Sequence, residues 1–489
     1  MRWKTACALL SLFAASVIVL PAQILTTLAN FNNTDGANPG SGSLVQATDG
    51  SLYGTTEHGG NSTACTPPCG VIFKITPGEA LTVVHSFDFT DGAYSVAGLV
   101  QAANGYLYGT TQFSADGNGT IFKITPAGAL STIHAFVGTD GSTPHAGLVQ
   151  AANGDLFGTT TYGGTSTACG TRGCGTIFKI TPDGVFTTLH NFQSTDGANP
   201  FGLVQAANGD LYGTTNFGGN TTCYSAGCGT VFKITPAGVF TALHNFLQNQ
   251  TDGTFPSAGL VQAADGNLYG TTSEGGAYLG GCGAPISGDL CGTIFEITPA
   301  GMLTTTHSFE MSDGESPNGL VQATDGNLYG TTYEGGGSNF CSEGCGTIFK
   351  ISLDGAFTTL YNSFGSTLGY LPEAGLLLAT DGNFYGTTNE GPYGSIGGYG
   401  YGTVFRFSVG LGPFVKTLPA LGLVGSIVRI LGTDLTGATS VTFNGIAAGF
   451  IVVSPAQILA RVPFGATTGK VQVITPSGTL LSNVGFVVL

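Results

Sequence analysis

The chain has 489 residues and a net charge of −15, with 8% charged and 42% hydrophobic residues and 81 glycines. This length allows a large repeat array plus a smaller module. Because the sequence has no basic stripe, we expect neither nucleic acid nor an anionic membrane surface as a partner. Short apolar runs between glycine-rich turns predict an all-β protein.

The N-terminus has the features of a secretory signal peptide. Two positive charges lie within residues 1–4, an apolar run extends from Ala6 to Leu20, and Ala22 offers a small residue for cleavage. The run is short for a retained membrane anchor, which is the alternative. We therefore assign residues 1–22 to a signal peptide and expect a secreted or cell-surface protein that is not inserted in the membrane after cleavage.

Ten cysteines remain once Cys7 leaves with the signal peptide. They form five local pairs, and the two repeats in which this segment is altered lack both cysteines rather than one. Joint presence or absence in an exported chain indicates disulfides, whereas zinc would need two further ligands in each repeat. The predicted disulfides are Cys65–Cys69, Cys169–Cys174, Cys223–Cys228, Cys282–Cys291 and Cys341–Cys345.

A repeated pair of motifs dominates residues 24–409. The sixth copy reads G-L-V-Q-A-T-D-G-N-L-Y-G-T-T from Gly319 and G-T-I-F-K-I from Gly346. The glycine of the Tyr/Phe-Gly-Thr-Thr motif recurs seven times, at intervals of 49 to 60 residues. Each unit contains four strand-like runs, a to d, which in the sixth copy are 320–323, 327–332, 347–351 and 357–364. Four antiparallel strands per unit is the composition of a propeller blade.

The two ends of the array complement each other. Residues 24–31 match strand d but have no a, b or c before them, whereas the last unit has a, b and c and no d. Pairing the orphan strand with the vacancy would close a ring and remove its exposed edges. The sequence therefore predicts an all-β fold with a seven-bladed β-propeller over residues 24–409, closed by the N-terminal strand.

Strand alternation places the loops on two faces. The uniform a–b and c–d turns should lie on one face, called face two. The b–c and d–a loops, which vary in length and carry the cysteine pairs, should lie on the other, called face one. Function commonly resides on variable loops over a rigid scaffold.

The repeat unit G-L-V-Q-A-x-D-G-N-L-Y-G-T-T…G-T-I-F-K-I-T-P-x-G resembles the Gloeobacter–Verrucomicrobia (GloVer) tandem repeat of exported bacterial proteins. The resemblance implies secretion and often a separate C-terminal module. It implies no assigned activity and transfers no functional residues.

The composition changes after Ser408, and residues 412–489 contain short alternating strands with turn signals about every ten residues, as in a small Ig-like β-sandwich. The core sequence G-A-T-S-V-T-F-N-G from Gly437 resembles an IPT/TIG immunoglobulin-like domain. Members in bacterial surface proteins serve as spacers or adhesive modules. Because strand c should end on face two, we expect this module to lie at that face.

The second residue after each Thr-Thr pair is the main site candidate, because it lies where strand b enters face one. Aromatic rings could stack on sugars, and carboxylates could bind hydroxyl groups or Ca²⁺. Solvated loop residues that face apart are the alternative. In chain order the candidates are His58, Phe113, Tyr162, Phe217, Glu274, Glu334 and Glu390.

Two further rings of residues are interpreted as structural. The Asp-Gly pairs of the d–a loops are typical turn formers, with a calcium role as the alternative. The histidines of strand d are spaced around the rim and cannot converge on one metal. The aspartates are Asp35, Asp91, Asp140, Asp196, Asp252 and Asp313, and the histidines are His85, His134, His190, His244 and His307.

The leading functional hypothesis is a non-enzymatic exported propeller that binds a glycan or an extracellular protein and acts as a monomer. A polysaccharide hydrolase or lyase that uses Glu274, Glu334 and Glu390 is the first alternative, and a purely structural surface protein is the second. We expect no metal and no cofactor, with Ca²⁺ as the single exception considered. No nucleophile elbow, phosphate-binding loop or His-Glu-x-x-His motif is present, and catalytic residues stay unassigned.

Overall fold

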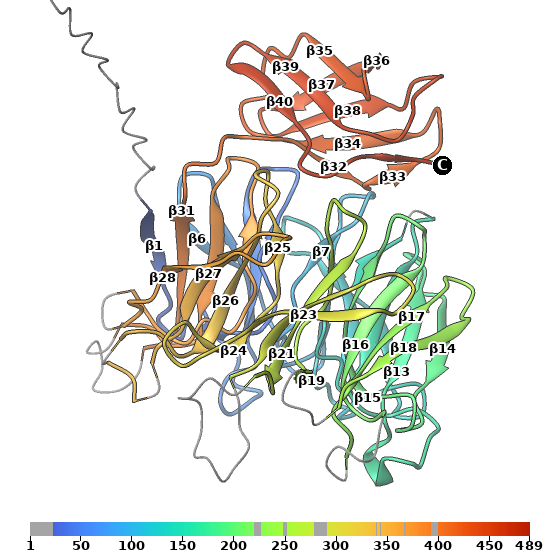
Figure 1. Cartoon of the computed structure of the whole chain (residues 1–489), viewed down its shortest axis with the longest axis vertical. Helices are drawn as coiled ribbons and strands as arrows, with labels where there is room; N and C mark the ends of the chain where they lie inside the picture. Colours follow the sequence, from blue (N-terminus) through green and yellow to red (C-terminus); the bar gives the residue numbers. More distant parts are fainter. Residues whose placement is uncertain are drawn as a thin grey trace, which may run out of the picture.

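The computed structural model describes residues 23–151, 153–219, 226–247, 252–277, 291–338, 340–342, 344–365, 368–392 and 400–489. These residues form strands and turns, apart from the 3-10 helix η1 (Gly170–Arg172). Between residues 24 and 408 they build seven antiparallel sheets in succession (Figure 1). The prediction of an all-β, propeller-like fold is confirmed. The predicted signal peptide lies outside the described residues.

Within each sheet the strands follow the order a, b, c, d. Strand a is β3 (Val45–Gln46), β7 (Val100–Gln101), β11 (Val149–Gln150), β15 (Ala198–Gln205), β20 (Val261–Gln262), β25 (Val321–Gln322) and β29 (Leu377–Leu378) in the first to the seventh sheet. In three sheets a short strand precedes it: β2 (Ala37–Pro39), β19 (Thr254–Pro256) and β24 (Glu315–Pro317). Strand b is β4 (Leu52–His58), β8 (Leu107–Thr111), β12 (Leu156–Thr160), β16 (Leu211–Phe217), β21 (Leu268–Glu274), β26 (Leu328–Glu334) and β30 (Phe384–Thr388).

Strand c is β5 (Val71–Ile75), β9 (Thr120–Ile124), β13 (Thr176–Ile180), β17 (Thr230–Ile234), β22 (Thr293–Ile297), β27 (Thr347–Ile351) and β31 (Thr403–Ser408). Strand d is β6 (Leu81–Ser86), β10 (Leu130–Ala135), β14 (Phe186–Asn191), β18 (Phe240–Asn245), β23 (Leu303–Ser308) and β28 (Phe357–Tyr361) in the first six sheets. In the sixth sheet the predicted strand c is correct, whereas strands a and d are shorter than predicted.

The repeated glycine of strand b is required by close packing. A Cβ atom on Gly54 would lie 2.5 Å from Cζ of Phe73 in the adjacent strand c, and one on Gly386 would lie 2.5 Å from Cζ of Phe405. The other five sheets have the same contact. These phenylalanines are fully buried, so each sheet gains a large apolar contribution from one ring that rests on the glycine backbone.

The two threonines of each Thr-Thr pair also have structural roles. In six sheets the first donates its hydroxyl to a backbone carbonyl of the next sheet, as Thr55 does to Ala97 at 3.0 Å and Thr331 to Ala374 at 2.9 Å. Thr387 of the seventh sheet has no such bond within the described part of the chain. The second donates to the carbonyl two residues later, as Thr56 does to His58 at 2.7 Å. This second bond occurs in all seven sheets and fixes the end of strand b.

Seven equivalent backbone hydrogen bonds join consecutive sheets. In each d–a loop one non-glycine residue has a φ between 50° and 58°. Its N–H donates to a backbone carbonyl of the preceding sheet. The acceptor is the residue directly before the Gly of the Gly-Thr-Ile-Phe motif or its equivalent, such as Cys69 before Gly70. The pairs are Tyr94–Cys69, Thr143–Asn118, Asn199–Cys174, Phe255–Cys228, Ser316–Cys291, Leu371–Cys345 and Asn38–Tyr401, all 2.9 to 3.1 Å. The last of these joins the first sheet to the seventh.

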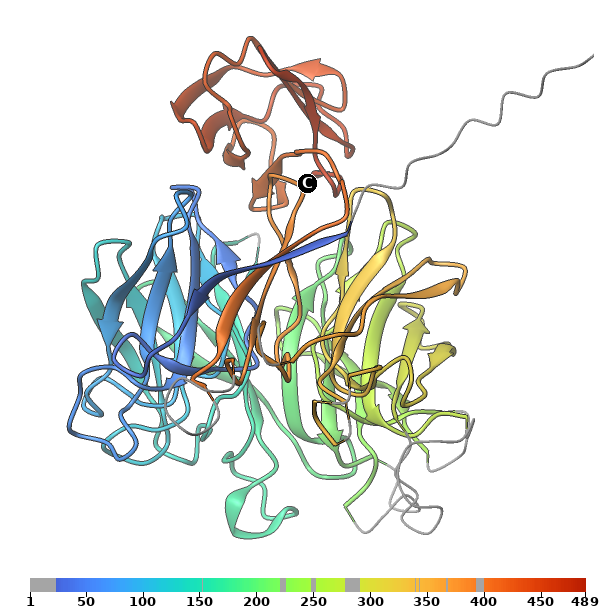
Figure 2. The same ribbon diagram turned by 90° about the vertical axis from the view of Figure 1, so that its left-hand side faces the viewer.

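Strand d of the seventh sheet comes from the N-terminus. The strand β1 (Ile24–Asn30) pairs antiparallel with β31, with Ile24 opposite Ser408 and Asn30 opposite Thr403 (Figures 1 and 2). Leu25 and Leu28 pack on buried clusters of the neighbouring sheets. The predicted pairing of residues near Ile24 with residues near Phe405 is therefore present.

The remaining strands form a two-sheet sandwich with its own buried core, which includes Val428, Val441, Phe443, Val473 and Phe486. One sheet contains β32 (Lys416–Leu418), β34 (Ile427–Leu431), β38 (Gln457–Arg461) and β37 (Phe450–Ser454). The other contains β36 (Ile446–Ala447), β35 (Ser440–Phe443), β39 (Val471–Thr475) and β40 (Gly478–Leu481). A parallel pair, β33 (Leu421–Gly422) and β41 (Val487–Val488), lies beside them.

The sandwich contacts the a–b turns, as expected from the direction of strand c (Figure 2). Thr433 lies 3.0 Å from the hydroxyl of Thr380 in the turn of the seventh sheet, and Arg429 donates to the carbonyl of Ala103 in the second. Lys416 donates to the carbonyl of Leu378, and burial lowers the pKa of this lysine to about 8. Face one, with the loops of variable length, is on the opposite side.

We predict that a chain that begins at Phe31 is less stable than the chain with β1. It would lose the partly buried Leu25 and Leu28 and leave β31 as an open edge, so its thermal midpoint should fall by about 5 °C or more. Adding a synthetic peptide of residues 23–31 should restore the midpoint, as measured by differential scanning calorimetry.

A peptide with proline in place of Thr26 and Leu28 is the matched control, because proline cannot complete a strand ladder. Equal midpoints with and without β1, together with no effect of the native peptide, would contradict the structural role of this strand.

Candidate functional site

Three predicted disulfides are present, and each pins a b–c loop of face one. Their Cα–Cα distances are 5.2 Å for Cys65–Cys69, 5.1 Å for Cys169–Cys174 and 5.3 Å for Cys341–Cys345. Cys228 and Cys291 are also disulfide-bonded. Their predicted partners, Cys223 and Cys282, lie outside the described residues. Because the closed loops are short, each bridge contributes only about 2 kcal/mol to stability.

The seven predicted ligand-binding residues lie at equivalent places, where strand b reaches face one. Each is opposite a residue of its own d–a loop in an antiparallel bridge or ladder, so the backbone at all seven positions is fixed. The pairs are His58–Ala37, Phe113–Ala93, Tyr162–Ser142, Phe217–Ala198, Glu274–Thr254, Glu334–Glu315 and Glu390–Tyr370.

Phe113 and Tyr162 line one groove between the second and third sheets. This groove has a volume of about 900 Å³, and Asn118, Ser142 and Thr143 add amide and hydroxyl groups to its wall. Phe113 is 38% exposed. A groove with two aromatic rings and several neutral hydrogen-bonding groups suits a polar ligand that also has apolar faces. It could be anticipated in part, because both rings were predicted to lie on face one.

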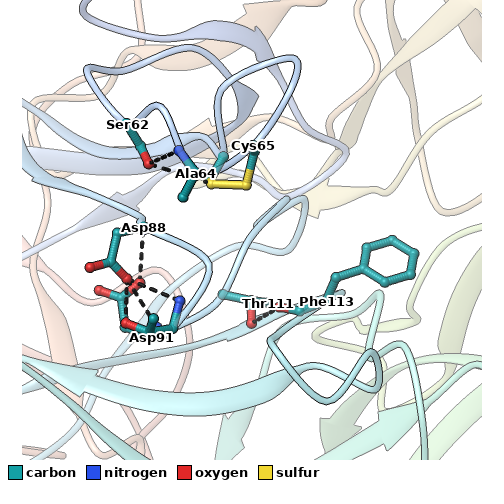
Figure 3. Close-up of a disulfide and its surroundings, with 9 residues drawn as sticks. Ser62, Ala64, Cys65, Asp88, Asp91, Thr111 and Phe113 are labelled. Carbon is teal, nitrogen blue, oxygen red and sulfur yellow. Dashed lines mark hydrogen bonds between the residues drawn. A yellow bond between two sulfur atoms is a disulfide. The ribbon is translucent and has the colours of Figure 1, made fainter.

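The groove also contains two features that the sequence did not reveal. Arg172, from the 3-10 helix η1, places its guanidinium 5.5 Å from the centre of the Tyr162 ring. Figure 3 shows the Phe113 side chain extending away from Thr111, whose hydroxyl bonds to the Phe113 carbonyl, and away from the disulfide of Cys65. The Phe113 ring is therefore presented outward by a backbone that is held in place.

The other predicted residues have different surroundings. His58 packs against Tyr94, with ring centres 5.3 Å apart, and Phe217 packs against Phe255 at 5.4 Å. Glu334 and Glu390 lie near Tyr333, and burial together with the carboxylates of Glu373, Glu334 and Glu390 raises the pKa of that tyrosine. Glu274 is not part of this group. The structure therefore brings together two of the three predicted acids and two of the three predicted aromatic residues.

A second space, called here the axial cavity, lies where all seven sheets converge. It has a volume of about 340 Å³ and is lined by the residues that precede or begin strand a. Its polar side chains include Glu373, His145 and Asn318. These residues were not predicted, although the sequence holds a signal: the residue after the Pro of the d–a loop, or after Ser95 in the second copy, varies while its neighbours are nearly uniform.

Burial dominates the electrostatics of the axial cavity. Desolvation raises the pKa of Glu373 from 4.5 to about 7, and the nearby charge of Glu57 adds to the effect. Burial lowers the pKa of His145, so its imidazole is neutral at pH 7. Glu57 directly precedes the predicted residue His58, and Tyr333 directly precedes Glu334. Two titratable groups that interact electrostatically with Glu373 therefore lie one position before members of the predicted ring.

The two rings interpreted as structural form pairs with each other. Nε2 of each strand d histidine lies 2.6 to 3.2 Å from the aspartate of its own d–a loop, as in His85–Asp91 and His190–Asp196. The same aspartates accept backbone N–H groups, as Asp196 does from Gln193 at 2.8 Å. Three of the histidines also stack on a phenylalanine of the next sheet, for example His134 on Phe186 at 3.9 Å. These contacts support a structural role for the five histidines and their five aspartates, and Asp35 accepts the N–H of Asn32 in the corresponding turn.

Within the described ranges, no three His, Cys, Asp or Glu side chains are arranged to hold a metal ion. Helices that could span a membrane are likewise not found in this part of the chain.

The chain is similar to one protein family and to several solved structures. The Gloeobacter/Verrucomicrobia repeat matches residues 17–171, 164–284 and 286–425. No curated protein matches the sequence. Similar solved structures include the periplasmic gluconolactonase PpgL of Pseudomonas aeruginosa. The two sequences are 14% identical, the match covers 66% of this chain and 85% of that chain, and the TM-score is 0.42. A gluconolactonase of Xanthomonas campestris has 13% identity, coverage of 65% and 88%, and a TM-score of 0.39. A luciferin-regenerating enzyme has 11% identity, coverage of 80% and 98%, and a TM-score of 0.42.

We predict that ionisation of Glu373 destabilises the fold as the pH rises. The unfolded chain loses this proton near pH 4.5 and the folded chain only near pH 7, so the folded state holds more protons between these values. The quantity to follow is the free energy of unfolding of wild type minus that of Glu373→Gln. This difference should fall between pH 4.5 and pH 7 and stay constant at higher pH. Because the side chain is partly buried, screening limits the change to on the order of 1–2 kcal/mol.

Urea denaturation at pH 5 and pH 8 measures this difference. Asp183→Asn, which changes an exposed carboxylate in a c–d turn, should behave like wild type at both pH values. The environment described for Glu373 would be contradicted if wild type and Glu373→Gln differed in free energy of unfolding by the same amount at pH 5 and at pH 8.

Proposed function

The chain belongs to the Gloeobacter/Verrucomicrobia repeat family, and we propose that it is an exported binding protein whose groove at Phe113 and Tyr162 takes a glycan. The observation that carries the proposal is the groove itself. Two aromatic residues from adjacent sheets line a space of about 900 Å³ together with amide and hydroxyl groups. Sugars present C–H faces to aromatic rings and hydroxyl groups to neutral polar side chains, so both kinds of surface are matched.

The size and the charge of the groove support an oligosaccharide. Its volume lies within the range typical of small-molecule sites, about 300–1,000 Å³. Arg172 gives one positive charge beside Tyr162, which suits a sugar with a carboxylate or sulfate substituent. The predicted acids Glu274, Glu334 and Glu390 are not among the residues that line this groove. In this proposal they have no role in glycan binding.

The proposal includes an architecture and a location. Residues 24–409 form a seven-bladed propeller closed by β1, and residues 412–489 form an IPT/TIG-type Ig-like domain that acts as a spacer. The β1–β31 ladder and the hydrogen bond from Asn38 to Tyr401 support the closure. The disulfides support a secreted or cell-surface location. In this proposal the protein is a monomer without nucleic-acid partners. The sandwich contacts face two, so it leaves the groove open to a large ligand.

A second candidate is a polysaccharide hydrolase or lyase. It is favoured by one observation: Glu334, Glu390 and Glu373 act together on Tyr333, and the pKa of Glu373 is raised to about 7. Glycoside hydrolysis uses a protonated and an ionised carboxyl group, and these three acids all act on one tyrosine. In this candidate the acids act on a chain that the aromatic groove holds.

We predict that Phe113→Ala and Tyr162→Ala each weaken glycan binding at least tenfold. Loss of one stacked ring should remove roughly 2 kcal/mol of binding free energy. A glycan-array screen of the mature protein identifies the ligand, and isothermal titration calorimetry then compares the variants. Phe340→Ala is the matched control, because Phe340 is an aromatic residue of the sixth sheet that is 43% exposed and lies outside the groove.

Unchanged affinity in both groove variants, or no glycan bound on the array, would contradict the proposal.

The triple change of Glu274, Glu334 and Glu390 to glutamine separates binding from catalysis. For a binding protein we expect glycan affinity to stay within about threefold of wild type and no new reducing ends to appear with either protein. Release of reducing ends or unsaturated products by wild type, lost by orders of magnitude in the triple variant, would instead establish the enzymatic candidate.

A further inference from the structure

The axial cavity is a second, separate space of the molecule. Residues from all seven sheets line it, whereas the groove at Phe113 and Tyr162 belongs to the second and third sheets. Much of its wall is apolar, with leucines such as Leu99 and Leu148 and with Ala97, Ala258 and Phe201. A ligand in this cavity would therefore contact apolar surface as well as the polar side chains of the wall.

One charged group of the cavity has no partner. Among the described residues, the carboxylate of Glu373 has neither a hydrogen bond nor an ion pair, although its environment opposes ionisation. The neighbouring polar residue Asn318 is satisfied, since its amide donates to the carbonyl of Pro372 at 2.7 Å and to the hydroxyl of Thr331 at 3.0 Å. Glu373 is partly buried and lines the cavity without a partner in the described part of the chain, so its carboxylate is available to a cationic group there.

The remaining titratable groups near the cavity add no positive charge. Glu57 is close enough to raise the pKa of Glu373, and Tyr333 is neutral because burial and the surrounding carboxylates raise its pKa. His145 lines the cavity, is neutral at pH 7, and has a buried Nδ1 atom without a partner in the described part of the chain. No lysine or arginine lines this space. Its electrostatic potential is therefore negative.

We propose that the axial cavity binds a small organic cation, with an ammonium group against Glu373 and an apolar body against the aliphatic wall. A volume of about 340 Å³ exceeds the space that a bare ion needs and fits a compact amine. A metal ion is disfavoured because the described side chains offer no group of three His, Cys, Asp or Glu ligands.

The pH dependence follows from the same residues. Glu373 must be ionised to attract an ammonium group. Tyr333, whose pKa is raised, and His145, whose pKa is lowered by burial, add no positive charge at pH 7. The titration of Glu373 falls between pH 6 and pH 8. Because the fraction of ionised Glu373 rises from about 10% to about 90% over this range, affinity for a cation should rise about tenfold.

The test uses the intact mature protein, benzylammonium as the probe and benzyl alcohol as its neutral analogue. Isothermal titration calorimetry at pH 8 should give a dissociation constant of about 1 mM or tighter for benzylammonium, and binding at least tenfold weaker for benzyl alcohol. Glu373→Gln should reduce the affinity for benzylammonium at least tenfold, and Glu57→Gln should reduce it less.

Asp183→Asn, Phe113→Ala and Tyr162→Ala should leave benzylammonium affinity unchanged, because none of these residues lines the axial cavity. Equal affinity of wild type for the amine and the alcohol, no binding of either, or an unchanged affinity in Glu373→Gln overturns the proposal. Because the groove variants are measured in the same experiment, failure of this site is distinguished from failure of the glycan site.

Discussion

The architecture depends on seven backbone hydrogen bonds that join each sheet to the one before it. Each is donated by a non-glycine residue held in the left-handed region, such as Tyr94 or Leu371. A bulky residue at positive φ is costly, so it persists only where the surrounding structure determines it. Here it turns the N–H of the d–a loop toward the neighbouring sheet. The variable loops of adjacent sheets are thereby brought together on face one, where the groove forms, and all seven sheets converge on the axial cavity.

Much of the fold could be predicted because the chain repeats one unit seven times. The motif around Gly330 supplied strand b, its turn and the position of Phe349, and the absence of strand d in the last unit implied the role of residues 24–31. The left-handed residues could not be predicted, since Tyr94, Phe255 and Leu371 share no side-chain property that favours positive φ. Their conformation is imposed by a partner in another sheet, which a local pattern does not record.

The candidate site was predicted only in part. Alternation along strand b placed Phe113 and Tyr162 on face one, and the groove between them follows from this placement. Glu373 and His145 were missed because their position depends on how the d–a loops converge at the axis. The sequence signal for these residues is one variable position close to a uniform Gly-Leu pair. It indicates a site only when the d–a loops of the seven copies are known to line one space.

The two proposed sites use different chemistry on one rigid scaffold. The groove offers aromatic and neutral polar groups, the axial cavity offers an unpaired carboxylate, and the sandwich is on the opposite face, where Lys416 and Arg429 contact the ring. The axial cavity, which all seven sheets line, requires that the first and seventh sheets be joined. Residue-resolved amide hydrogen exchange tests this requirement most directly. The account predicts that the N–H of Asn38 is protected as strongly as those of Tyr94 and Asn199, and exchange of Asn38 at the rate of an open loop would contradict it.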